Sequence, residues 1–123
     1  KEPPMLNAKD SGRARPTVGR KSEANSENNA GNAHFQRKEY AKAVECYNKA
    51  FACDEGNVQY LLNSAAALFE MEDYMQCIKV CQKAIMLGYQ LSADRQLLKK
   101  AFIRVGRARL KQGRGQDARK YFG

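Results

Sequence analysis

The feature that most constrains the fold of this chain is an internal repeat with a period of 34 residues. A shift of that length superposes small residues on small ones and bulky residues on bulky ones, except where a tyrosine meets a cysteine. The pairs are Gly31 with Ala65, Phe35 with Phe69, Tyr40 with Tyr74, Ala43 with Cys77, Tyr47 with Cys81 and Ala50 with Ala84. A further shift of 41 residues continues the match into the C-terminal third, for example from Ala65 to Gly106. Such a period indicates a stack of similar units that bury their apolar faces against one another.

Each unit is predicted to be a pair of helices. Apolar residues recur at three- and four-residue spacing, as in an amphipathic helix, and no alternating strand pattern is present. The expected helices cover residues 22–37, 41–53, 57–70, 74–86, 93–112 and 115–122, and Ser92 is expected to be the N-cap of the fifth. Paired helices with this period are the tetratricopeptide pattern. The predicted fold is therefore all-α, a right-handed superhelix of helix-turn-helix repeats with a concave groove.

The domain organisation follows from composition and from the repeat. Residues 1–21 hold all three prolines and are expected to be a disordered basic arm. Residues 22–123 are expected to form one domain, with repeats at about 24–57, 58–91 and 99–123 and an insertion at 92–98. The third repeat stops inside its second helix, so we expect a truncated array that belongs to something longer. Small residues such as Gly31 and Gly106 are expected to let helices approach closely.

The positive charge of the chain is concentrated at its C-terminal end. The net charge is +9, which divides into +4 for residues 1–21, −3 for residues 22–92 and +8 for residues 93–123. A local basic surface indicates an anionic partner. Nucleic acid is not expected, because aromatic side chains do not interleave the basic run in the way that base stacking needs. No apolar run approaches the ~20 residues of a membrane span, and the first residues lack the apolar centre of a signal peptide, so we expect a cytoplasmic protein without a membrane partner.

The sequence offers little for catalysis or for a cofactor. Its four cysteines form no CxxC pair, and His34 is the only histidine, so neither a metal site nor a cofactor is expected. The thiols are expected to be reduced and buried. There is no phosphate-binding loop and no nucleophile–base pair, and His34 is expected to pack between helices. We therefore expect a binding module and not an enzyme.

The repeat register predicts which side chains line the groove, because the first helix of each repeat faces it. Lys100, Arg104 and Arg107 recur at i, i+4 and i+7 and therefore share one helix face. The complete set of expected groove residues is Asn28, Asn32 and Phe35 from the first helix, Asn63, Ala67 and Glu70 from the third, and Lys100, Arg104, Arg107 and Lys111 from the fifth. Amides and cations can both donate hydrogen bonds to carboxylates and to peptide carbonyls.

Three stretches, 30–35, 63–69 and 100–106, resemble the carboxylate-clamp tetratricopeptide domains of heat-shock co-chaperones, above all the stress-inducible organising protein family. That family has a similar insertion between its second and third repeats. The resemblance implies binding of an extended peptide that ends in Glu-Glu-Val-Asp, the tail of the seventy- or ninety-kilodalton chaperones. It covers about residues 24–122.

The resemblance also implies a role for individual side chains. Asn32 and Asn63 would hold the terminal carboxylate together with a lysine, and Lys100 and Arg104 would hold oxygens further along the peptide. Residues that match Phe35, Ala67 and Glu70 would meet the peptide upstream. The chain departs from the family at Asn28, which stands where the clamp lysine is expected, and Arg107 is expected to compensate for the missing charge. The alternative is a tetratricopeptide scaffold that binds another acidic partner in a non-chaperone assembly.

Overall fold

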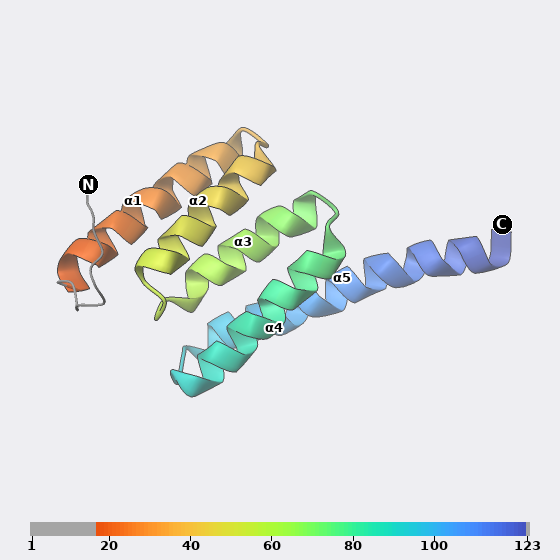
Figure 1. Cartoon of the computed structure of the whole chain (residues 1–123). Helices are drawn as coiled ribbons and strands as arrows, with labels where there is room; N and C mark the ends of the chain where they lie inside the picture. The colour runs from red at the N-terminus through yellow and green to blue at the C-terminus, as the bar shows by residue number, and fades with distance from the viewer. Residues whose placement is uncertain (1–16, 123) are drawn as a thin grey trace.

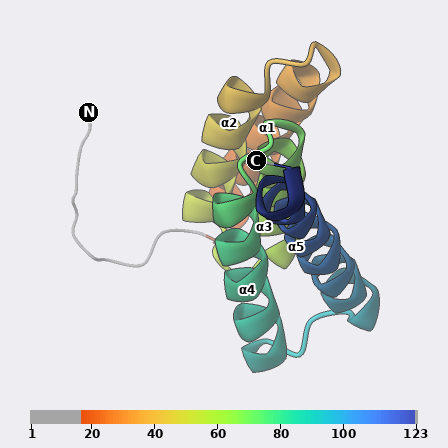
Figure 2. The ribbon, with the colours of Figure 1, turned by 90° about the vertical axis from the view of Figure 1, so that its right-hand side faces the viewer.

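The protein is a stack of antiparallel helices. The computed structural model describes the backbone of residues 17–122 and the side chains of residues 20–113. The helices are α1 (Thr17–Gln36), α2 (Tyr40–Cys53), α3 (Val58–Glu70), α4 (Tyr74–Gln90) and α5 (Arg95–Phe122). Each helix packs against the next, and α5 also contacts α3, as the two views show (Figures 1 and 2). This arrangement confirms the predicted all-α fold of helix-turn-helix repeats. No helix in the described range is both long and apolar enough to span a bilayer.

The repeat is visible in the backbone of the turns. Lys38 and Glu72 lie one period apart, and both adopt a left-handed conformation, with φ of 63° and 64°. They end α1 and α3 in the same way, because a residue of this conformation redirects the chain after a helix. Side chains cap the starts of α3 and α4, whereas Glu39 at the start of α2 makes no such hydrogen bond. Asn57 accepts a hydrogen bond from the backbone N of Gln59 at 3.0 Å, and Asp73 accepts one from that of Gln76 at 3.3 Å.

The turn between α4 and α5 differs from the prediction. The helix α4 continues to Gln90 instead of ending at residue 86. Ser92 is not the N-cap of α5, because it has a φ of 54°, whereas an N-cap residue is typically extended. Asp94 takes that role, since its carboxylate accepts a hydrogen bond from the backbone N of Gln96 at 2.7 Å.

The helix α1 begins at Thr17 and not at residue 22. Its first described side chain, Arg20, is anchored to the end of α2. The Nε of Arg20 donates to the carbonyl of Cys53 at 3.1 Å, and its second guanidinium nitrogen donates to that of Ala52 at 2.9 Å. Arg20 thereby supplies donors to carbonyls of the last turn of α2, which lie beyond the reach of the N–H groups of that helix. The first 16 residues of the predicted arm lie outside the described part of the chain.

The largest departure from the prediction is in α5, which is one helix of 28 residues instead of two. The glycines at 113 and 115 cost a helix about 1 kcal/mol each, which is not enough to end it. The chain does not turn back at these glycines. Among the residues whose side chains are described, no second helix therefore covers the outer face of α5. Phe102 and Leu110 of α5 are consequently 52% and 56% exposed. The side chains of the expected helix 115–122 lie outside the described part of the chain.

Gly31 and Gly106 occupy equivalent positions of the repeat but differ in how closely other side chains approach them. A Cβ atom on Gly31 would lie 2.6 Å from the ring of Tyr47, so the absence of a side chain lets α1 and α2 approach closely. A Cβ atom on Gly106 would meet nothing within 4 Å. The expected role in close packing is therefore right for Gly31 and wrong for Gly106, because no helix lies over that side of α5.

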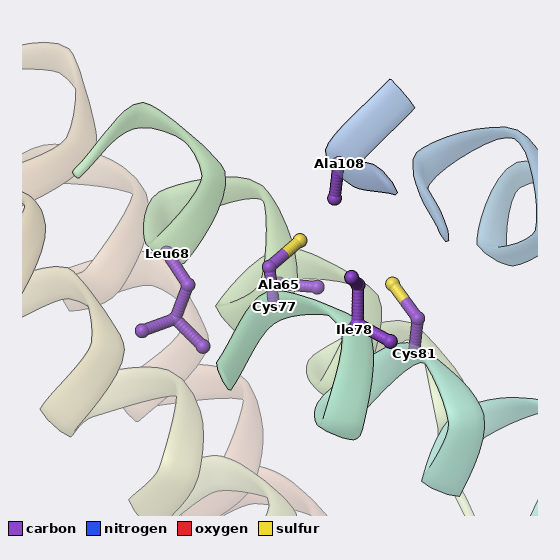
Figure 3. Packing of buried hydrophobic residues seen from close by; sticks show 6 residues of the cluster. All are labelled: Ala65, Leu68, Cys77, Ile78, Cys81 and Ala108. Atoms are coloured by element: carbon purple, nitrogen blue, oxygen red, sulfur yellow. The ribbon is translucent and has the colours of Figure 1, made fainter. Parts of the chain in front are cut away.

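The main core lies where α3, α4 and α5 meet. It consists of Ala65, Leu68, Cys77, Ile78, Cys81 and Ala108 (Figure 3). Cys77 and Cys81 are fully buried and fill the space of small apolar residues, as predicted. Cys46 and Cys53 are partly exposed, so the expected burial of all four thiols is right for only two of them. This core fixes α5 against α3 and α4.

His34 makes a side-chain hydrogen bond in the turn after α1, whereas it was expected only to pack between helices. Its Nδ1–H donates to Oε1 of Glu39 at 2.7 Å, and Nε of Arg37 donates to the same oxygen at 3.3 Å. The hydrogen bond from His34, followed by that from Arg37, lowers the pKa of Glu39 below its ordinary value of 4.5. A lowered carboxyl pKa stabilises the fold above the unfolded-state value, and this contribution is lost as the pH falls through the folded-state value.

Replacing His34 with alanine is expected to raise the pKa of Glu39 toward 4.5, because the main hydrogen bond to the carboxylate is lost. The measurement is an NMR titration of the Glu39 side-chain carboxyl carbon between about pH 2.5 and 7. Arg37→Ala is the matched comparison and should give a smaller rise, since its contact is longer. An unchanged pKa in His34→Ala would contradict the assigned cause.

Candidate peptide-binding groove

A groove lies between α3 and α5, with α4 at its floor. Its volume is about 400 Å³. The side chains that line it are Gln59, Leu62, Asn63, Ala65, Ala66, Cys81, Lys100, Ile103, Arg104 and Arg107. Four residues that the sequence predicted for the groove are therefore brought together here: Asn63, Lys100, Arg104 and Arg107.

The wall formed by α5 carries three cations. Ala101 and Ala108 are buried and pack with residues of the α3–α4 pair, so they set the rotation of α5 about its axis. Lys100, Arg104 and Arg107 follow along the groove side of this buried stripe. Small side chains at the contact allow a close approach of the helices. The three cations consequently line the groove beside α3, where Lys100 and Arg107 stay exposed to solvent and Arg104 is partly buried.

Arg104 is further fixed by an aromatic ring of α3. Its guanidinium carbon lies 5.4 Å from the centroid of the Phe69 ring, which is a cation–π geometry. Phe69 in turn meets Tyr74 edge to face, with centroids 5.3 Å apart. Because two packed rings support it, the guanidinium loses less conformational freedom when it binds an anion. The sequence register placed Arg104 in the groove but did not reveal this support.

The buried thiols of Cys77 and Cys81 lie near Arg104, and the pKa of each is shifted. The hydrogen bond from the thiol of Cys81, and then the charge of Arg104, lower the pKa of Cys77 against its burial. The same hydrogen bond and burial raise the pKa of Cys81. Cys81 is one of the residues that line the groove, and it lies on α4 next to Ile78 of the core (Figure 3).

The opposite wall comes from α3, where the neutral amide of Asn63 is linked by hydrogen bonds to Gln59 and to Asn28 of α1. The Nε2 of Gln59 donates to Oδ1 of Asn63 at 2.8 Å, and the Nδ2 of Asn63 donates to Oδ1 of Asn28 at 2.8 Å. On α1, Asn32 accepts a hydrogen bond from the hydroxyl of Tyr47 at 2.7 Å, which fixes its carbonyl and leaves its N–H groups on the outside. Sequence reasoning missed Gln59. The signal was present, because Gln59 lies one helical turn before Asn63 on the same face.

Six predicted residues do not line this groove: Asn28, Asn32, Phe35, Ala67, Glu70 and Lys111. Phe35 packs edge to face on Tyr40, with centroids 5.2 Å apart, and contacts a buried cluster that includes Ala67. Ala67 is fully buried, so its expected contact with a peptide is wrong, because α2 covers this side of α3. Glu70 is exposed at the end of α3, and Lys111 is exposed on α5.

The groove is therefore electrostatically asymmetric. The α5 wall carries Lys100, Arg104 and Arg107, whereas the polar side chains of the α3 wall are the neutral amides of Gln59 and Asn63. Such a site favours a ligand with carboxylates, because cations and amide N–H groups both donate to them. Asn28, where a lysine was expected, supplies no charge.

Comparisons with known proteins agree with this architecture. Residues 31–72 match the TPR repeat family. The chain is 38% identical to Hsp70-Hsp90 organizing protein 3 of Arabidopsis thaliana over 88 residues, a region that makes up 72% of this chain. It spans only 16% of the length of that relative.

Solved structures give the same result at the level of the domain. The N-terminal domain of stress-induced protein-1 (STI-1) from C. elegans superposes with a TM-score of 0.73 and 35% identity, covering 76% of this chain and 74% of that one. The second TPR of Spaghetti (RPAP3), solved with the HSP90 peptide SRMEEVD, superposes with a TM-score of 0.65 and 32% identity, covering 85% and 89%. The chain therefore belongs to the tetratricopeptide-repeat domains of the Hsp70–Hsp90 organizing protein family.

Proposed function

We propose that this domain is a co-chaperone module that binds the acidic C-terminal tail of a heat-shock chaperone of the seventy- or ninety-kilodalton class. The observation that carries the proposal is the convergence of Lys100, Arg104, Arg107 and Asn63 on one groove. A tail that ends in Glu-Glu-Val-Asp presents several carboxylates to these donors. The similarity to a domain solved with the peptide SRMEEVD supports the same ligand class. We further propose that the module acts in the cytoplasm and is not catalytic.

The proposed mechanism is a carboxylate clamp shared by three helices. Lys100 and Arg104 neutralise carboxylates of the peptide from α5, while Asn32 and Asn63 donate amide hydrogen bonds from α1 and α3. Charge-assisted hydrogen bonds contribute about 1.5–3 kcal/mol each. Arg107 supplies a third cation one turn further along α5 and offsets the neutral Asn28. Phe35 and Glu70 are proposed to meet the upstream part of a peptide that extends beyond the groove.

The test is a fluorescence anisotropy titration with labelled SRMEEVD and its C-terminally amidated twin. The amidated peptide is expected to bind at least about tenfold more weakly, because it loses one carboxylate that the clamp holds. A third peptide, with its acidic side chains replaced by amides, should bind more weakly still.

Two outcomes would count against the proposal. Equal binding of the free and amidated peptides would exclude a terminal clamp and favour a scaffold that binds an internal acidic segment. No binding of any acidic peptide would remove the proposed ligand class. Titrations at two salt concentrations separate specific contacts from general attraction, because screening weakens the latter more.

A further inference from the structure

A chain of three amides crosses from α3 to α1 at the edge of the groove. Gln59 begins it, and its Nε2 donates to Oδ1 of Asn63 at 2.8 Å. Asn63 continues it, and its Nδ2 donates to Oδ1 of Asn28 at 2.8 Å. Asn28 therefore ends the chain with its own Nδ2, which no side chain of the described range accepts. The three residues act as one hydrogen-bonded unit that joins the two helices.

This chain has a direction. Gln59 donates, Asn63 both accepts and donates, and Asn28 accepts, so the donated N–H groups point from α3 toward α1. Turning all three amides by 180° would give the opposite direction, with the carbonyl oxygen of Asn28 at the free end. The observed direction presents donors to a carboxylate, whereas the opposite one would present an acceptor and repel it.

The cations of α5 favour the observed direction. Gln59 lines the same groove as Lys100, Arg104 and Arg107. Its Nε2 donates to Asn63, so its carbonyl oxygen is the first atom of the three-amide series. A negative amide oxygen is stabilised near positive charge. Hydrogen bonds in a chain also polarise one another, so an anion at the Asn28 end would strengthen every member.

We propose that Gln59 is a positioning residue that sets the specificity of the groove for carboxylates. It acts through Asn63 and holds the amide of Asn28 with its N–H groups toward the peptide. A directed amide thereby takes the place at which the resembling domains carry a lysine. This inference rests on the proposed function, because it concerns the same groove and the same acidic ligand.

The test is a double-mutant cycle on the affinity for labelled SRMEEVD. Gln59→Met keeps the length of the side chain and its helix propensity but removes the amide. It is expected to weaken binding about three- to tenfold, the effect of one lost hydrogen bond. In the background of Asn28→Ala the same change should weaken binding less than about twofold, because the residue through which it acts is gone. Gln82→Met, at an exposed position of α4, is the matched control and should bind like the unaltered domain.

The outcomes separate this inference from the proposed function. If the unaltered domain binds and Gln59→Met weakens binding equally in both backgrounds, Gln59 does not act through Asn28 and the inference is overturned. It is also overturned if Gln59→Met has no effect. If the unaltered domain binds no acidic peptide, the proposed function and this inference fall together. Circular dichroism melting checks that each variant is folded, and Gln59→Leu replaces Gln59→Met if the methionine variant is not.

Discussion

Replacing Lys100 and Arg104 together with alanine is expected to weaken binding of SRMEEVD by at least about 100-fold. Both side chains line the groove, and Arg104 is held in place by the Phe69 ring. Each contributes a charge-assisted hydrogen bond of about 1.5–3 kcal/mol, so losing both removes about 3–6 kcal/mol. Anisotropy titration of the labelled peptide measures the loss. The stability of the domain should change little, because Lys100 is exposed and Arg104 only partly buried.

The matched control is the double variant Lys99→Ala with Arg109→Ala. It removes the same two positive charges from the same helix, but both residues are exposed and neither lines the groove. Its affinity should fall by less than about threefold near physiological salt, where exposed charges are screened. If the control weakens binding as strongly as the groove variant, net charge alone attracts the peptide and the clamp is wrong.

Gly31→Ala and Gly106→Ala are expected to change stability in opposite directions. The new methyl group at Gly31 would lie 2.6 Å from the buried ring of Tyr47, so the ring and α2 must move. Overpacking costs about 1–3 kcal/mol, and the gain in helix propensity of about 1 kcal/mol offsets only part of it. At Gly106 nothing lies within 4 Å of the methyl group, so Gly106→Ala should stabilise the fold by about 0.5–1 kcal/mol.

Urea unfolding followed by circular dichroism measures both free energies of unfolding. Gly31→Ala should also weaken peptide binding, because Tyr47 holds Asn32 through a hydrogen bond of 2.7 Å. Gly106→Ala serves as its control on a helix of the same domain and should leave peptide affinity unchanged. Destabilisation by Gly106→Ala would show that a side of α5 that is open in this structure is covered in solution.

The fold followed closely from the sequence where the repeat was regular. The period placed the turns at Lys38 and Glu72 in the same backbone conformation, and four helices lie near their predicted positions. Prediction was poorest where the repeat was irregular. Ser92 was expected to cap α5, but the cap is Asp94, because the choice between two nearby cap residues depends on how α4 ends.

The groove could be predicted in part for a similar reason. The register brought Asn63, Lys100 and Arg104 together, since the first helices of successive repeats share one face. It could not place Gln59, because the link of Gln59 to Asn63 and then to Asn28 depends on the distance between α1 and α3. The same limit applies to Ala67, which the register aimed at the peptide and α2 buries.

The sequence by itself determined the helical repeat and the cationic face of Lys100, Arg104 and Arg107. These features depend on spacing along one chain, and spacing fixes which residues share a helix face. Only the tertiary structure decided that α5 runs on as one helix, that Phe69 supports Arg104 and that three amides join α3 to α1 in one direction. The support of Arg104 and the amide chain depend on distances between helices, which no periodicity records; the packing of Ala101 and Ala108 sets this distance only for α5.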